Sequence, residues 1–497
     1  MLITGLIVGL ALVCLAGCAT SALNLAPAHP DEPWVPATSV SGSAPAGYAL
    51  PPAADLANVP PPVLVEGARV YSLSELIDIA ESSNPLTRIA WNDARRIALG
   101  AGIVASAYLP QLSASAIGGY QASSGHDAAP GTPVLGNGSA SGTVAAVSLQ
   151  WLLFDFGERA AVVDMAKQAS LISNIAFTAA HQQVIYAVSE AFYAQAAAQA
   201  RVATAEQSFQ DSQAIQTAAQ ARYQHGVGTV IEVDQARLGL AQAELARVQA
   251  AGAAQDAQLA LLTAMGISPL TKIRIADVAG RQLPPSPPPP AQAVLMQALS
   301  RRPDVQSAFA AEQASLAHVR AARAEFMPKM FLAGNATYSS AGLDVTALPA
   351  VGQQGPTVNV SGSRFGGSIF AGFTVPIYDG GMRAAVLYQA KAEVDSAQAW
   401  STRVKEDAVR QIVMADNALR TSLSAFHAAE SLAEAAQTNF YAGLTAYCNG
   451  VGSVTDVTLA ETQLLQARNA SSDAYSGALA AAATLALASG ALGTAPQ

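Results

Sequence analysis

Tyr-Gln-His-Gly-Val-Gly at residues 223–228 recurs as Tyr-Cys-Asn-Gly-Val-Gly at residues 447–452, with an offset of 224 positions. The tripeptide Asp-Phe-Gly at residues 155–157 returns with the same offset as Asp-Gly-Gly at residues 379–381. Self-similarity at a fixed spacing indicates that one structural unit is present more than once. We therefore expect a fold of two homologous halves, each with one copy of these turn sequences.

Two proline pairs extend the repeat toward the N-terminal side of each half. Pro85 and Pro110 are 25 positions apart, as are Pro303 and Pro328, and the offset between these copies is 218. The offset has grown by six at the Asp-Gly element, which predicts one insertion of six residues in the second half. A proline suits the first turn of a helix and is disfavoured inside one. Each pair is thus expected to bracket one helix.

The composition excludes several classes of protein. The 497 residues are 51% apolar and 12% charged, with a formal charge of −9. Beyond the N-terminus no apolar run reaches the roughly 18 residues of a membrane-spanning helix, and the acidic balance argues against nucleic-acid binding. The chain has none of the familiar catalytic, nucleotide-binding or metal-binding motifs, and its six histidines are scattered. We expect no enzyme activity, no cofactor and no metal site.

Residues 1–17 have the features of a targeting segment. They carry no charge, contain an apolar core from Leu6 to Leu15, and end in Leu-Ala-Gly before Cys18. The tetrapeptide resembles the lipobox of bacterial lipoproteins, which implies that Cys18 is the lipid-bearing first residue of the mature chain. An ordinary secretory signal or a short membrane anchor is the alternative. Once residues 1–17 are removed and Cys18 is lipidated, Cys448 is the only free thiol, so no disulfide within the chain is expected.

Proline-rich segments divide the chain, because consecutive prolines form neither helix nor central strand. One such run, Pro-Pro-Ser-Pro-Pro-Pro-Pro, fills residues 284–290 between the halves. The predicted organisation is a signal peptide at 1–17, a lipidated proline-rich tether at 18–70, a first repeat at 71–283, a linker at 284–290, a second repeat at 291–489 and a tail at 490–497.

Within each half the pattern predicts the order helix, helix, strand, strand, helix, helix. Apolar and polar residues alternate with period two in four segments, which favours strands of about nine or ten residues, the length of a tilted membrane-spanning strand. The four segments are near residues 112–120, 147–153, 332–338 and 368–375, with predicted loops at 121–141 and 339–363. No proline interrupts residues 157–223 or 381–447. A continuous helix of that length is about 100 Å long.

Four strands are too few to form a membrane barrel by themselves. The smallest such barrels have about eight strands, and an open sheet edge in lipid leaves backbone N–H and C=O groups unpaired at several kcal/mol each. If these strands enter a bilayer, several chains must contribute to one barrel. The alternative is a pair of soluble hairpins packed on a helical body.

Three elements resemble the TolC-like outer membrane efflux proteins, in particular their lipoprotein branch (NodT-like or OprM-like). They are Arg222-Tyr223-x-x-Gly226, Val-Pro-Ile-Tyr-Asp-Gly-Gly at residues 375–381 and Ser-Val-Thr-Asp-Val at residues 453–457. The resemblance implies a mainly α-helical chain that forms a homotrimer, with one twelve-stranded β-barrel continued by a twelve-helix α-barrel. It also implies outer-membrane lipid, a periplasmic adaptor protein and an inner-membrane efflux pump as partners.

Candidate functional residues lie beside the Gly-Val-Gly turns. Glu232 and Asp456 are 224 positions apart, and each follows its turn at the start of a predicted helix. One hypothesis places these carboxylates in a ring at the periplasmic aperture. The other gives them a capping role, because Thr-Val-Ile-Glu and Ser-Val-Thr-Asp both fit the capping-box pattern. By resemblance, Arg222 and Tyr223 tether a closed aperture, and ordinary packing of helix ends is the alternative. The second copy keeps the tyrosine as Tyr447, a further candidate, but has Ala446 in place of the arginine.

Asp155 and Asp379 lie where predicted strand changes to predicted helix, and we expect both to be N-cap residues. Gly157, Gly380 and Gly381 would permit the sharp change of direction. Together the patterns and the resemblance predict a lipid-anchored outer-membrane duct that extends into the periplasm and passively exports small molecules received from a pump. Two alternatives remain, namely the outer-membrane duct of a type I protein secretion system and a periplasm-spanning lipoprotein that does not conduct.

Overall fold

The computed structural model describes residues 69–123, 138–277, 283–284, 292–340 and 365–492. All of the described residues belong to one compact unit of the chain. The predicted signal peptide, Cys18, nearly all of the predicted tether and residues 285–290 of the linker lie outside the described residues.

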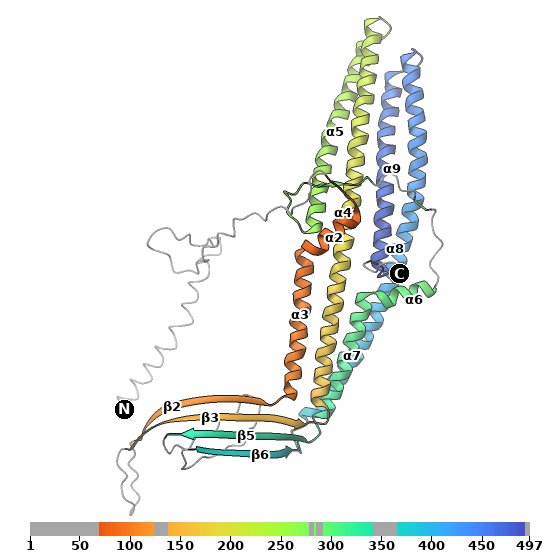
Figure 1. Ribbon diagram of the computed structural model, residues 1–497. Coiled ribbons are helices and arrows are strands. Elements are labelled where there is room, and N and C mark those ends of the chain that lie inside the picture. Colours follow the sequence, from red (N-terminus) through yellow and green to blue (C-terminus); the bar gives the residue numbers. More distant parts are fainter. Residues whose placement is uncertain (1–68, 124–137, 278–282, 285–291, 341–364, 493–497) are drawn as a thin grey trace, which may run out of the picture. The chain divides into compact units, whose positions relative to one another are not determined.

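The order helix, helix, strand, strand, helix, helix occurs in each half of the described chain (Figure 1). The first half contains β1 (Val70–Tyr71), α2 (Leu73–Ser83), α3 (Pro85–Ala105), η3 (Ser106–Tyr108), β2 (Gln111–Ser123), β3 (Gly138–Phe154), α4 (Glu158–Gln224), α5 (Val230–Met265) and β4 (Arg274–Ile275). The second contains α6 (Gln292–Arg301), α7 (Pro303–Ala324), β5 (Lys329–Ser339), β6 (Phe365–Thr374), α8 (Met382–Cys448) and α9 (Val454–Ala488).

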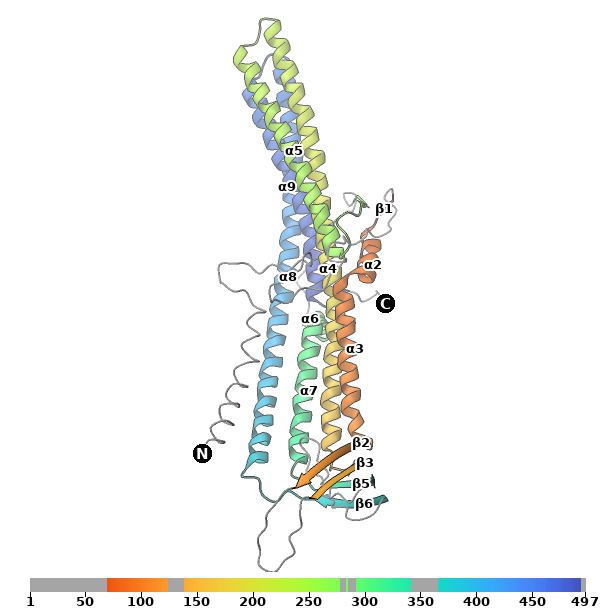
Figure 2. The ribbon, with the colours of Figure 1, turned by 90° about the vertical axis from the view of Figure 1, so that its left-hand side faces the viewer.

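The two long helices predicted from the absence of proline are confirmed. Both α4 and α8 contain 67 residues, which corresponds to about 100 Å. Along its length α4 packs first beside α3 and α7 and then beside α5 and α9, whereas α8 packs beside α7 and α9 (Figure 2). Many of the buried residues in these helices are alanine or serine, whose small side chains let helix axes approach closely. Among the described helices, none has the length and apolar character needed to cross a membrane.

Strands β2, β3, β5 and β6 form one antiparallel sheet in that order, so β2 and β6 are its edges. Paired residues lie on the same face of a sheet, and successive residues lie on opposite faces. A row of paired residues that runs across the four strands therefore lies on one face, and the neighbouring row lies on the other. The apolar row is Leu112, Leu149, Gly334 and Ile369, and the polar row is Ser113, Ser148, Asn335 and Ser368.

The predicted strand lengths hold for β5 and β6, with 11 and 10 residues, but are wrong for the first hairpin. There β2 has 13 residues and β3 has 17, so both strands extend into the predicted loop at 121–141. Strand pairing is carried by backbone hydrogen bonds, which do not require an apolar pattern in the side chains. The register of β3 against β5 shifts between Leu152 and Phe154. The strict alternation of faces is broken there, so it no longer places Leu153 on the same face as Leu149, as the sequence pattern predicts.

Equivalent residues of the two halves join the helices end to end. Asn84, just before α3, donates from Nδ2 to the carbonyl of Ala264 near the end of α5, at 3.1 Å. Arg302, 218 positions later and just before α7, donates from Nη1 to the carbonyl of Ala488 at the end of α9, at 2.7 Å. These bonds satisfy carbonyls that a helix end leaves without partners. Helix α3 thereby continues α5 toward the sheet, and helix α7 continues α9.

Candidate functional site

The Gly-Val-Gly turns lie at the ends of α4 and α8 that are farthest from the sheet (Figures 1 and 2). Gly226 and Gly450 have φ values of 75° and 84°, a conformation that side chains with a Cβ atom disfavour. The N–H groups of Val227 and Gly228 both donate to the carbonyl of Arg222 at 3.0 Å. Each turn thus reverses the chain within a few residues and brings α5 or α9 back along its partner.

Buried side chains from α4, α5, α8 and α9 form a shared core behind the turns. Its members are Ile215, Ala219, Ala236, Phe440, Tyr447, Val454, Val457, Ala460 and Leu464. Because this core contains residues from both halves, the two helical hairpins are packed against each other near their turns. The candidate residues of the two copies can therefore interact within one chain.

Three of the five candidate aperture residues, Arg222, Glu232 and Tyr447, form what we call the Arg222 cluster. Arg222 donates from Nη1 to the carbonyl of Tyr447 at 2.9 Å, and its guanidinium lies over the Tyr447 ring, 4.8 Å from the centroid. The Tyr447 hydroxyl donates to Oε2 of Glu232 at 3.4 Å, and Nε of Arg222 lies 3.8 Å from the same oxygen. The cluster links α4 and α5 of the first half to α8 of the second.

Burial and charge keep the Tyr447 hydroxyl in its donor form. The Tyr447 side chain is fully buried. Burial raises the pKa of this hydroxyl above its ordinary value, and the Glu232 carboxylate raises it further, while Arg222 opposes the rise. The arginine and the carboxylate are only partly exposed, at 17% and 25% of their side chains. Their attraction is therefore screened less than that of a surface ion pair.

Asp456 and Tyr223 are not part of the Arg222 cluster. The Asp456 carboxylate is exposed and accepts a 2.7 Å hydrogen bond from the hydroxyl of Ser453, while the Tyr223 side chain is 45% exposed at the surface. Thr229 and Ser453 accept hydrogen bonds from the N–H groups of Glu232 and Asp456, as helix caps do. Neither carboxylate in these described turns bonds back to the cap N–H, so the predicted reciprocal capping boxes are not formed.

At the strand-to-helix junctions, the N-cap residues are not the predicted ones. Gly157 and Gly381, with φ values of 95° and 91°, occupy the N-cap positions of α4 and α8. Asp155 and Asp379 lie two residues earlier, where each carboxylate accepts N–H hydrogen bonds from its N-cap glycine and from the arginine four residues on. The expected N-cap assignment of the aspartates is therefore wrong by two residues, because the turn needs the left-handed conformation at the cap itself.

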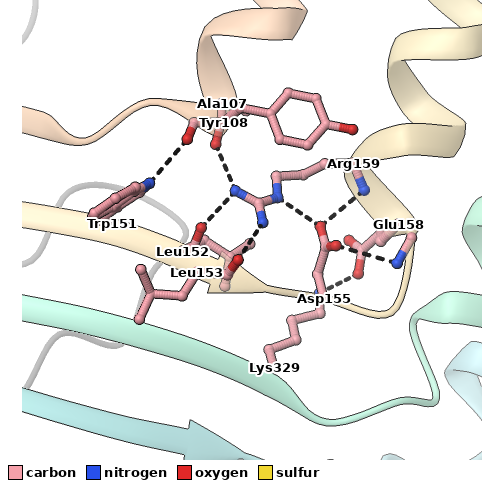
Figure 3. Close-up of polar contacts among 10 residues, drawn as sticks. Ala107, Tyr108, Trp151, Leu152, Leu153, Asp155, Glu158, Arg159 and Lys329 are labelled. Carbon is pink, nitrogen blue, oxygen red and sulfur yellow. Dashed lines mark hydrogen bonds and ion pairs between the residues drawn. The ribbon is translucent and has the colours of Figure 1, made fainter.

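Arg159 holds the first junction together, and the sequence interpretation did not single it out. Its guanidinium donates to Oδ2 of Asp155 at 2.8 Å and to the carbonyls of Ala107, Leu152 and Leu153 at 3.0, 2.5 and 3.3 Å (Figure 3). One side chain thus fastens the end of η3, the end of β3 and the start of α4. The available signal was its recurrence as Arg383 in the second half.

Hydrogen bonding has a larger effect than burial on the pKa of Asp155. Burial by itself would raise the pKa of this carboxyl, but hydrogen bonds from the backbone N–H and guanidinium of Arg159 hold the pKa below its ordinary value. In the second junction Arg383 approaches Asp379 at 2.7 Å, and Gly380, with a φ of 69°, takes the position of Phe156. Phe156 has a φ of 53°, the one positive value at a non-glycine residue in the described chain.

Neither the turns nor the junctions contain the donor set of a metal centre. Within the described ranges, no group of three or more histidine, cysteine, aspartate or glutamate side chains is placed to hold a metal ion. What the candidate site offers is mechanical. The Arg222 cluster restrains the separation of two helical hairpins, and the junctions fix the direction of the long helices relative to the sheet.

The sequence of this chain matches a known protein family and two characterised proteins. The outer membrane efflux protein family matches residues 76–267 and 294–491, one match in each half. Protein CyaE of Bordetella pertussis is 28% identical over 447 residues, covering 87% of this chain and 88% of that protein. Outer membrane protein OprJ of Pseudomonas aeruginosa is 28% identical over 355 residues, covering 68% and 67%.

A solved structure supports the same assignment at the level of the fold. The CmeC outer membrane channel of Campylobacter jejuni superimposes with a TM-score of 0.71 at 20% identity, covering 84% of this chain and 85% of that one. The mostly helical fold thus resembles TolC-like channel structures, and the resemblance inferred from the sequence motifs is confirmed. The two family matches together span well over half of the residues. The chain belongs to the outer membrane efflux protein family.

Proposed function

We propose that three copies of this chain form an outer-membrane duct, with a twelve-stranded β-barrel in the membrane and a twelve-helix α-barrel in the periplasm. The observation that carries the proposal is a four-stranded sheet that combines an apolar face and a polar face with two open edges, β2 and β6. Each unpaired backbone group in lipid costs several kcal/mol. Pairing β6 of one copy with β2 of the next removes every edge.

The two rows of the sheet decide which face meets lipid. In our proposal the row of Leu112, Leu149 and Ile369 faces the bilayer, and the row of Ser113, Ser148, Asn335 and Ser368 faces the lumen. This arrangement follows the general pattern of membrane barrels, which are apolar outside and polar inside.

Cys18 would carry the lipid anchor at the outer membrane. The energy for export would come from an inner-membrane pump reached through a periplasmic adaptor, since the sequence contains no nucleotide-binding motif. The exported molecules would be small compounds. Negative charge at the turns would favour cations at the mouth, and Asp456 supplies an exposed carboxylate there. We expect Asp456→Ala to lower the cation selectivity of single channels, and an unchanged reversal potential would remove this role.

The assembly is tested on the full-length protein extracted in mild detergent. Native mass spectrometry should give three chains, and planar bilayers should show discrete conductance steps. A stable monomer would refute the shared barrel. A trimer without any conductance would favour the structural lipoprotein over the duct.

A matched pair of neighbouring residues tests the orientation of the sheet. Leu149→Arg places a charge in the apolar row, at a cost of about 2–4 kcal/mol near the middle of a bilayer. Gln150→Arg places the same charge on the opposite face, which we assign to the aqueous lumen. We expect the first variant to lose trimers from the outer membrane and the second to retain them. Equal amounts of both would contradict the assignment.

The same duct would also serve a type I protein secretion system. Cross-linking in cells followed by mass spectrometry separates the two functions by the inner-membrane partner that is recovered. An efflux pump with its adaptor is the expected result. A partner dedicated to protein export would replace small molecules by a polypeptide as the transported substrate.

A further inference from the structure

A cavity with a mixed polar and apolar lining lies between α4, α5 and α9, on the sheet side of the Gly-Val-Gly turns. Its volume is about 130 Å³, well above the roughly 10–15 Å³ that one water molecule requires. Its polar lining comprises Ser208 and Ser212 of α4, Gln242 of α5, and Thr458, Glu461 and Thr462 of α9. Gln242 and Thr462 are exposed at the surface, so the cavity is open to solvent on one side. Its size and its polar lining predict that it holds water.

Glu461 is the one ionisable group that lines this cavity among the described residues. Its residue is 9% exposed, and its Oε1 accepts a hydrogen bond from the hydroxyl of Ser208. No basic side chain in the described chain forms an ion pair with it. A buried carboxylate without a cation is costly, so such a group tends to take up a proton instead.

The charges on the surrounding helices do not compensate Glu461. On α4 the nearby charge is Asp211, which has the same sign. On α5 Arg247 is engaged with Glu206 and Glu244, at 3.4 and 3.7 Å. Helix α8, which packs along α9, adds no charge that acts on Glu461. Burial raises the pKa of the Glu461 carboxyl above its ordinary value, Asp211 adds to the rise, and the hydrogen bond from Ser208 opposes it.

We propose that Glu461 is a proton-binding site that controls the packing of α5 against α9. With a proton, the carboxyl remains in the cavity and the three helices stay closely packed. Without it, the carboxylate draws more water into the cavity and α5 separates from α9. The only species exchanged is the proton, which passes between the carboxyl and water.

Two contacts next to the cavity connect it to the turns. A Cβ atom added at Gly239 of α5 would lie 3.7 Å from Cγ2 of Thr458 on α9, so these helices meet closely beside Glu461. Farther toward the turns, Glu232 of α5 binds Tyr447 at the end of α8, just before the turn into α9. Separation of α5 from α9 would therefore strain the Arg222 cluster. Only the resulting effect on conductance rests on the proposed duct function.

The experiment measures the proton and the helix spacing separately in the full-length protein in detergent. Infrared difference spectra record the C=O band of protonated carboxyls as pH is varied. Spin labels at the exposed positions Leu238→Cys and Leu459→Cys, with Cys448→Ser, report the distance between α5 and α9 within one chain when labelled protein is diluted with unlabelled protein. We expect the distance to increase as pH rises through the titration of the Glu461 band.

Three variants decide the outcome. Glu461→Gln should abolish the band and keep the short distance at every pH. Ser208→Ala should move the midpoint to higher pH, because the hydroxyl favours the ionised form. Asp473→Asn is the control, an acid on α9 that pairs with Arg201 at the surface, and it should leave the response unchanged. Each unit of midpoint shift corresponds to about a tenfold change in the ratio of packed to separated helices.

A distance that does not change with pH, or a change that persists in Glu461→Gln, would overturn the proposal. Absence of conductance in wild type would instead refute the duct and leave the distance measurement intact. The failure of one proposal is therefore distinguishable from the failure of the other.

Discussion

Replacement of Arg222 by methionine is the sharpest perturbation of the tether between the two helical hairpins. Methionine retains a long apolar side chain but cannot donate to the carbonyl of Tyr447, which the guanidinium reaches at 2.9 Å. It also loses the stacking on the Tyr447 ring and the proximity to Glu232. The hydrogen bond between Tyr447 and Glu232 remains, so the variant weakens the cluster without dismantling the turn.

The magnitude follows from the contacts that are lost. A hydrogen bond from a charged donor contributes about 1.5–3 kcal/mol, a partly buried cation–π contact about 1 kcal/mol, and an ion pair at 3.8 Å no more than about 1 kcal/mol. Since contacts in one network are not additive, we take about 3 kcal/mol for each chain. If the cluster holds the aperture closed, this shifts the closed-to-open ratio by about two powers of ten.

Single-channel recording in planar bilayers measures the effect. We expect Arg222→Met to raise the open probability and the mean conductance over wild type. The control is Arg237→Met, because Arg237 is an exposed arginine on α5 near the same turn. Lower thermal stability with unchanged conductance would assign the cluster to helix-end packing alone. Unchanged stability and unchanged conductance would refute the reasoning about the contacts.

Three further predictions concern stability, each measured as thermal or urea-induced unfolding of the detergent-solubilised protein. Arg159→Met should cost about 3 kcal/mol, the lower end for a broken buried ion pair, because Asp155 loses its cation but keeps its bonds from two backbone N–H groups. Arg383→Met should cost less, because Asp379 is the more exposed partner; equal costs would contradict the difference between the junctions. The lowered pKa of Asp155 implies a stabilisation that is complete above its ordinary pKa of 3.8 and disappears as pH falls through the folded-state value, so Asp155→Asn should flatten the acid limb. Gly266→Ala should destabilise the folded protein, because φ is +72° and the new Cβ would lie 2.8 Å from Cγ of Asn84. Gly252→Ala, inside α5 with open space around it, should stabilise it by up to about 1 kcal/mol.

Local features of this fold follow from the residue order because their causes are local. Absence of proline over 67 residues is sufficient to expect α4 and α8 as single helices. Period-two alternation places Leu149 and Gln150 on opposite faces whatever strand lies beside them. The glycine turns follow from the need for positive φ at Gly226 and Gly450. The lengths of β2 and β3 were underestimated, because serine and alanine carry little pattern while their backbones pair all the same.

The interactions between the halves were decided by tertiary structure alone. The sequence places Glu232 and Asp456 at equivalent positions, yet one carboxylate reaches Tyr447 across the two hairpins and the other remains beside its own cap. Arg222 and Tyr447 are 225 positions apart, and Glu461 meets Ser208 across 253. No local pattern specifies such distant pairs, because they depend on how two long helical hairpins align along their lengths. That alignment is set by packing of small side chains over many turns, which only the folded chain reveals.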